Sequence, residues 1–273
     1  MRTLVAATDF SGSSIHAAHY AADMAGAIMA DLVLFSAVPA PLPISEIPVP
    51  EAILSDMMSE AGRKLDDLKA ELAARTNGKV DISTVILMGH FAERIGQISK
   101  KYNPFAIVMG IPAGKSIGRF LSGSNTFSVI DKNPDPVLII PEKSGFRSIA
   151  KIGLACDLEA VADTIPFKLL NDWLSAFNSS LDIIHVSRNE KDLQASEMSE
   201  SIVLQNHLNK FHPVFAFLTG DNLTERLNNY GKEHKLDLLI VVPKHHSFAG
   251  LFSKKFSREI MVQPEVPVLA IHV

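Results

Sequence analysis

The chain repeats one pattern of apolar segments. In the first half these segments span residues 3–9, 31–36, 105–110 and 136–140. In the second half they recur in the same order at residues 151–157, 181–186, 237–242 and 267–271. The first segment of each set ends on an acid, Asp9 or Asp157, and the last begins Pro-Val-Leu. A repeat of this length indicates a duplicated domain, so we expect one domain over residues 1–143 and another over 149–273.

Helical periodicity alternates with these apolar segments. Three stripes of apolar residues recur at intervals of three or four: Ile15, Ala18, Ala22 and Ala25; Ile53, Met57, Ala61, Leu65, Leu68 and Leu72; Val161, Ile165, Leu169, Leu170, Trp173 and Phe177. Ser11 and Ser13 precede the first stripe and suit a helix N-cap. Strands that are apolar throughout are typical of a parallel sheet covered on both faces. The pattern predicts an α/β fold of two tandem doubly wound parallel-sheet domains, Rossmann-like, with ligands bound beyond the carboxyl ends of the strands.

Composition excludes several classes of protein. A net charge of −4 and a pI of about 6.2 leave no overall basic field, so we expect no nucleic-acid partner. No uncharged apolar run is long enough to cross a membrane, and the N-terminus reads directly into a strand, so we expect a cytoplasmic protein. The one cysteine, Cys156, lies in an apolar strand and is predicted to be a buried, inert thiol. His245 and His246 are adjacent and lack a third ligand, so no metal site is expected.

Residues 109–126 form a glycine-rich loop after an apolar strand. Gly110, Gly114, Gly118 and Gly123 permit close approach of a ligand to the backbone. Gly123, Ser124 and Asn125 then open a helical stretch, and the free N–H groups of a helix N-terminus suit a phosphate. Residues 110–116 resemble the G-x-x-x-x-G-K-[ST] loop of P-loop ATPases, but only three residues separate the glycines. We therefore reject a P-loop.

These elements together resemble a tandem universal stress protein. The resemblance rests on Ala-Thr-Asp-Phe-Ser around Asp9, on the spacing of Gly110, Gly123 and Ser124, and on Pro-Val-Leu at 136–138. In ATP-binding members of that family, the first-strand Asp and the residue after the second strand line the adenosine, and the glycine loop holds the phosphates. The resemblance therefore implies ATP, with or without Mg²⁺, in the first domain, at the following positions: Asp9, Ala37, Gly110, Ala113, Gly123, Ser124 and Asn125. Ala113 stands where the family has its second glycine, and we expect its methyl group to narrow the loop.

The second half does not repeat the glycine loop. After Val242, residues 243–257 keep only Gly250, and Lys254 or Lys255 falls at the position of the helix-opening glycine. A bulky side chain there blocks the approach of a phosphate to the backbone. We expect no nucleotide in this half and a structural or regulatory role.

Three functions remain compatible with the sequence. The first is a stress-response regulator or adaptor that binds ATP in its first domain and acts on an unidentified protein partner. The second is a nucleotide-free dimerisation or interaction module, favoured by Ala113 and Pro112. The third is a slow ATPase, but Asp9 is the only acid that the motifs place near the pocket, so we expect no enzyme. The resemblance also implies that the last strands, 136–140 and 267–271, pair as an internal pseudo-dimer, with a homodimer as a further option.

Overall fold

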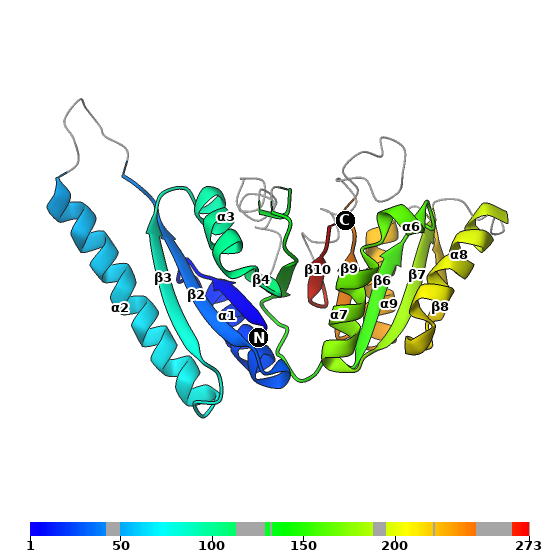
Figure 1. The fold of residues 1–273 in the computed structure, drawn as a ribbon, viewed down its shortest axis with the longest axis horizontal. Helices are drawn as coiled ribbons and strands as arrows, with labels where there is room; N and C mark the ends of the chain where they lie inside the picture. Colours follow the sequence, from blue (N-terminus) through cyan, green and yellow to red (C-terminus); the bar gives the residue numbers. More distant parts are fainter. Residues whose placement is uncertain are drawn as a thin grey trace. The chain divides into compact units, whose positions relative to one another are not determined.

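The computed structural model describes residues 1–41, 50–112, 129–131, 133–187, 195–220, 222–243 and 264–272. They form two compact units. The first contains Met1–Pro112 and continues to Phe146, and the second begins at Arg147. In each unit helices lie against a sheet (Figure 1).

The first unit is a parallel sheet in the order β3-β2-β1-β4-β5. Its strands are β1 (Thr3–Ala7), β2 (Asp31–Val38), β3 (Ile82–Met88), β4 (Ala106–Ile111) and β5 (Val137–Pro141). Its helices include α1 (Gly12–Ile28), α2 (Glu51–Arg75) and α3 (Phe91–Tyr102). The chain order reverses between β1 and β4, as expected of a doubly wound sheet.

The second unit repeats that order as β10-β9-β6-β7-β8. Its strands are β6 (Lys151–Cys156), β7 (Ser180–Ser187), β8 (Val214–Thr219), β9 (Leu238–Val241) and β10 (Val268–Ala270). Its helices include α6 (Val161–Thr164), α7 (Phe167–Phe177), α8 (Ala195–Leu208), the 3-10 turn η1 (Asn209–Phe211) and α9 (Leu223–Glu233). The tandem α/β prediction is confirmed, with β3 and β8 added to the repeated strands.

Helices cover both faces of each sheet. Successive strand residues point to opposite faces, so the contacts of neighbouring residues identify the helix on each side. On β7, the buried Asp182 accepts a hydrogen bond from Tyr230 of α9, whereas His185 lies 3.5 Å from the carboxylate of Glu197 on α8. Cys156, at the end of β6, is buried, as predicted.

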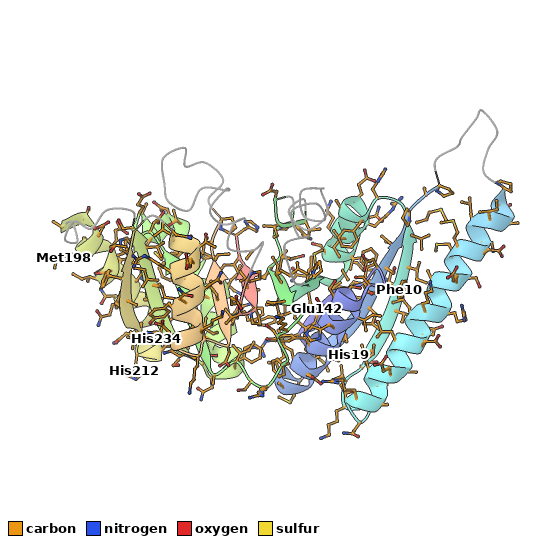
Figure 2. All side chains as sticks on the ribbon, turned by 180° about the vertical axis from the view of Figure 1, so that it is seen from behind. Phe10, His19, Glu142, Met198, His212 and His234 are labelled. Carbon is orange, nitrogen blue, oxygen red and sulfur yellow. The ribbon has the colours of Figure 1, made fainter. Side chains whose placement is uncertain are left out.

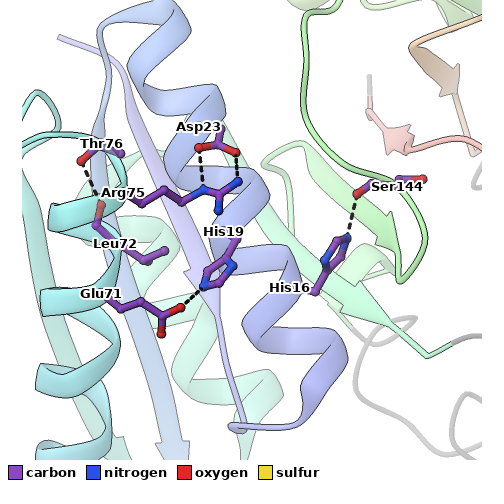
Figure 3. A network of polar contacts seen from close by, with 8 residues as sticks. All are labelled: His16, His19, Asp23, Glu71, Leu72, Arg75, Thr76 and Ser144. Carbon is purple, nitrogen blue, oxygen red and sulfur yellow. Dashed lines mark hydrogen bonds and ion pairs between the residues drawn. The ribbon is translucent and has the colours of Figure 1, made fainter.

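In the first unit, α2 is tied to α1 at its C-terminal end. The Arg75 guanidinium donates two hydrogen bonds to the Asp23 carboxylate, at 2.8 and 2.7 Å, and His19 lies 2.8 Å from Glu71 (Figure 3). The buried residues of α2 all belong to the C-terminal part of the predicted stripe: Ala61, Leu65, Leu68 and Leu72. Ile53, at the other end, is 49% exposed. The sheet therefore covers only part of that stripe.

The segment after β5 is also held on α1. The His16 ring donates from Nε2 to the Ser144 carbonyl at 2.7 Å (Figure 3), and Tyr20 meets Phe146 edge to face at 5.2 Å. These contacts fix the last residues of the first unit immediately before the second begins.

The apolar stripe predicted over residues 161–177 is divided between two helices. Helix α6 ends at Thr164, and α7 starts after Pro166, because proline lacks an N–H and clashes with the preceding turn. The corresponding α1 runs unbroken for 17 residues. Among the helices described in either unit, none is long and apolar enough to span a membrane.

Candidate functional site

Three of the predicted site residues gather at the carboxyl edge of adjacent strands in the first unit. Ala7 pairs with Phe35, so Asp9 and Ala37 both lie two residues beyond that pair, Asp9 in the turn after β1 and Ala37 on β2. Ala6 pairs with Val108, which brings Gly110 on β4 level with the residue before Asp9. The edge they share is the point where the strand order reverses, the usual ligand position in such sheets.

The turn from β1 into α1 holds Asp9 in one orientation. Its Oδ1 accepts hydrogen bonds from the Ser11 amide at 3.0 Å and the Ser11 hydroxyl at 2.6 Å. Phe10 between them has a positive φ of 63°, and its amide donates to the Thr8 hydroxyl at 2.9 Å. A left-handed conformation is rare for an aromatic residue, so these bonds stabilise a strained turn.

The Asp9 carboxylate is exposed, and its pKa is lowered. Partial burial acts to raise the pKa, but hydrogen bonds from the Ser11 hydroxyl, the Ser11 amide and Ser14 outweigh it. Ser11 is the N-cap of α1, as predicted, and the partial positive charge of that helix end also favours an anion. Asp9 is therefore ionised at neutral pH and presented to solvent among hydroxyl groups.

Gly110 is required by packing within the unit. A Cβ at this position would lie 2.0 Å from the Ser13 carbonyl oxygen, in the first turn of α1. Its role beside a phosphate stays a prediction, because this close approach of β4 to α1 already accounts for a glycine here. The remaining predicted residues, Ala113, Gly123, Ser124 and Asn125, lie outside the described residues.

A second glycine at this edge was not assigned a role from the sequence. Gly89 has φ 132°, and a Cβ there would lie 2.6 Å from Nε of Arg94, which donates to the Met88 carbonyl at 2.7 Å. The second unit repeats this arrangement with Gly220, at φ 125°, and Arg226. The recurrence of a glycine followed five or six residues later by arginine in both halves was the available sequence signal.

The equivalent turn in the second unit has the same backbone and different surroundings. Asp157 accepts from the Glu159 amide at 3.2 Å, and Leu158 between them has φ 54°. Asp157, however, is only 4% exposed. The amide of Val161, at the start of α6, donates to the Glu200 carboxylate of α8 at 2.8 Å. The chain's own acid thus occupies the helix terminus.

His185 adds to this cluster. Burial lowers its pKa, and the nearby acids Glu197, Asp157 and Glu159, together with the Cys156 carbonyl, act to raise it. The net effect leaves a neutral imidazole surrounded by carboxylates, a poor environment for a phosphate. The loop residues predicted to differ here, Lys254 and Lys255, and the pair His245 and His246, lie outside the described residues. Among the residues described, no group of three or more His, Cys, Asp or Glu side chains could hold a metal.

Comparison with known proteins agrees with this fold. The family model described as the universal stress protein family matches residues 1–141. A universal stress protein from Archaeoglobus fulgidus DSM 4304 superposes with a TM-score of 0.73 at 15% identity, covering 99% of this chain and 98% of that one. A putative universal stress protein from Pseudomonas aeruginosa UCBPP-PA14 gives 0.59 at 12% identity, covering 100% and 93%. At such identities the likeness shows the fold alone. No curated protein matches the sequence.

Proposed function

Because this chain belongs to the universal stress protein family, we propose that its first unit binds an adenine nucleotide, ATP, and that the protein acts as a regulatory switch or adaptor. Asp9 and Ala37 would contact the adenosine, and Gly110 and the loop residues Ala113, Gly123, Ser124 and Asn125 the phosphates. The second unit would bind no nucleotide and serve the structure or a partner.

One contrast carries this proposal. Asp9 is exposed and ionised at the reversal point of its sheet, whereas Asp157 is buried at the same point of the other sheet. A nucleotide needs an accessible acceptor for its ribose hydroxyls, and it needs helix N–H groups not already taken by an acid. The first unit offers the accessible acceptor, Asp9. In the second unit, Glu200 already accepts from the first amide of α6, so that amide is not free for a nucleotide.

The nucleotide is proposed as a regulatory ligand. A carboxylate whose pKa is lowered is a weak general base at neutral pH, because proton transfer is most efficient when the pKa lies near the working pH. Among the described residues, the side chains that hydrogen-bond with Asp9 to lower its pKa are those of Ser11 and Ser14, which carry hydroxyls. Regulation then requires that ATP bind two arrangements of the protein with different affinities.

The first test is to denature the protein as purified, identify any released nucleotide by mass spectrometry, and titrate the emptied protein with ATP in a calorimeter, with and without Mg²⁺. We expect one adenine nucleotide per chain. A folded sample that releases none and gives no heat would favour the alternative, a nucleotide-free interaction module.

Two variants locate the site. Asp9→Asn and Gly123→Lys should each weaken ATP binding about tenfold or more, since a hydrogen bond to a charged group contributes about 1.5–3 kcal/mol. Asp67→Asn removes the same charge from an exposed position on α2 and should leave the affinity unchanged. Equal affinity in all three proteins would show that the nucleotide binds elsewhere.

A further inference from the structure

The exposed large apolar side chains of the second unit gather on two neighbouring elements. Within the described part of that unit they are Met198 and Ile202 on α8 and Val214 and Phe217 on β8. Exposed apolar residues scattered singly are ordinary, but a contiguous group marks a surface that binds another molecule. Val214 and Phe217 are three residues apart, so their side chains project from opposite faces of β8. We therefore call Met198, Ile202 and Phe217 the rim strip.

Among the strands that the structure describes, β8 is the last of its sheet, with β7 on one side only. The Gly220 amide donates to the Ser187 carbonyl of β7 at 3.1 Å. Because amides alternate in direction along a strand, those of Phe215, Phe217 and Thr219 point away from β7. The strand reads VFAFLT, without the lysine, proline or inward charge that usually protects an edge.

The helix side of the rim strip lies next to this edge. On α8, Leu204 and Leu208 face the sheet, while Glu200 and His207 face α6 and α7 through Val161 and a ring stack on Phe167. Helical periodicity puts Met198 and Ile202 on the side away from α6 and α7. Figure 2 shows Met198 at one end of its unit.

Phe217 projects from the sheet face that α8 covers. It is the register partner of His185, and its ring meets the His185 ring at 5.9 Å, while His185 in turn lies beside Glu197 of α8. Phe217 therefore lies on the same face of the sheet as α8, the helix that carries Met198 and Ile202.

The first unit covers its equivalent edge with its own helix. Helix α2 packs against β3, and a Cβ at Gly62 would lie 3.6 Å from Cδ1 of Ile86, the residue that corresponds to Phe217. Ile86 is accordingly half-buried, whereas Phe217 is 45% exposed. Helix α8 has 14 residues against 25 in α2, and Phe217 is more exposed than Ile86.

We propose that the β8 edge binds a second copy of this chain, with the two β8 strands antiparallel about a two-fold axis at Phe217. The outward amides and carbonyls of Phe215, Phe217 and Thr219 then meet those of Thr219, Phe217 and Phe215 of the second copy. Pairing about Phe217 thus matches every outward residue of the strand with another outward residue.

Two further properties favour a copy of the same chain. The strand has no charged residue, so self-pairing brings no like charges together. A two-fold axis perpendicular to the sheet places both α8 helices on the same face, where Met198 and Ile202 of one copy contact those of the other, and the two Phe217 rings form a cross-strand pair.

The test compares oligomeric states of the full chain by sedimentation equilibrium. Phe217→Glu should raise the dimer dissociation constant at least about 30-fold, the loss expected at the centre of an interface. The matched control, Ile53→Glu, replaces an apolar residue of similar exposure, 49% against 45%, and should leave the dimer intact. Circular dichroism establishes whether each variant is folded. If Phe217→Glu does not fold, the double variant Met198→Glu with Ile202→Glu disrupts the same surface.

A cross-linking measurement tests the two-fold axis. Phe217→Cys should give a disulfide-linked dimer, because residues paired across such an axis lie at a distance that a disulfide can span, and the native Cys156 is buried. Ile53→Cys should stay monomeric on the same gel. A wild-type chain that is monomeric at high concentration would overturn the proposal and leave a different protein as the partner of the rim strip. A dimer that survives Phe217→Glu and does not cross-link would also overturn it. Neither result depends on nucleotide binding.

Discussion

The turns after β1 and after β6 follow the same backbone path and differ in what surrounds them. Each places an aspartate, a residue with positive φ, and an amide that donates back to the aspartate. The Phe105 amide donates to the Thr3 carbonyl, and Asp237 donates to Lys151 in the same way, which makes Val242 the counterpart of Gly110. In the first unit, Gly110 has no side chain, so the first turn of α1 packs directly against its backbone. In the second unit, Val242 has a side chain at this position, and it is buried.

The residue on the neighbouring strand is one of several differences between the surroundings of the two turns. With glycine on β4, the first turn of α1 comes close to the sheet and Asp9 remains exposed. In the second unit α6 lasts only four residues, and Glu200 reaches its first amide. The duplicated fold therefore survives while the surroundings of its reversal point diverge.

The largest expected effect comes from giving the first unit the residue of the second. Gly110→Val would force a side chain against the Ser13 carbonyl, so the free energy of unfolding should fall by about 3 kcal/mol or more. Urea unfolding followed by circular dichroism measures this. Gly96→Ala, where a Cβ meets nothing within 4 Å, should be neutral or stabilising. A Gly110→Val protein as stable as the wild type would show that α1 can move away from β4 without a loss of unfolding free energy.

A smaller effect is expected from the acid that closes the second unit. Glu200→Gln weakens a charge-assisted bond to the Val161 amide, so the unfolding free energy should drop by about 1 kcal/mol. The only tryptophan of the chain, Trp173, is buried in α7, so its fluorescence reports this unit. Glu233→Gln makes the same chemical change at an exposed position on α9 and is the control. An identical midpoint in both variants would mean that water replaces the carboxylate.

Much of the fold was predictable because it depends on local patterns. The repeated apolar strands, the α1 stripe and the Ser11 cap can be read from neighbouring residues, and Pro166 also marks the break between α6 and α7. The contacts that distinguish the units join distant residues: Gly110 with Ser13, and Glu200 with Val161. No local period encodes such pairs. The phosphate-side residues, the domain bounds at 143 and 149, and the pairing of the last strands stay predictions.

The tie between α1 and α2 is expected to contribute less. Asp23→Ala removes the carboxylate that accepts both bonds from Arg75, but the pair is partly exposed, so the loss should be about 0.5 kcal/mol. Raising the salt concentration should reduce the difference from wild type, since ions screen exposed charges. Asp66→Ala, an exposed acid on α2, should change nothing measurable. A loss above about 2 kcal/mol would indicate that α2 leaves the sheet when this tie is cut.

The smallest effect is a difference in how the two units respond to acid. The pKa of His185 is lowered in the folded chain, mainly by burial, so the unfolded chain binds more protons as the pH falls below about 6.5. The second unit should therefore lose stability as the pH falls from 6.5 toward the lowered pKa. Asp9 also has a lowered pKa, but it is an acid, and its contribution is lost only as the pH falls below its usual value of 3.8. Between about pH 7 and 5, the urea midpoint reported by Trp173 should thus decline, and His185→Gln should flatten that decline. An unchanged slope in the variant would show that His185 does not cause the pH response.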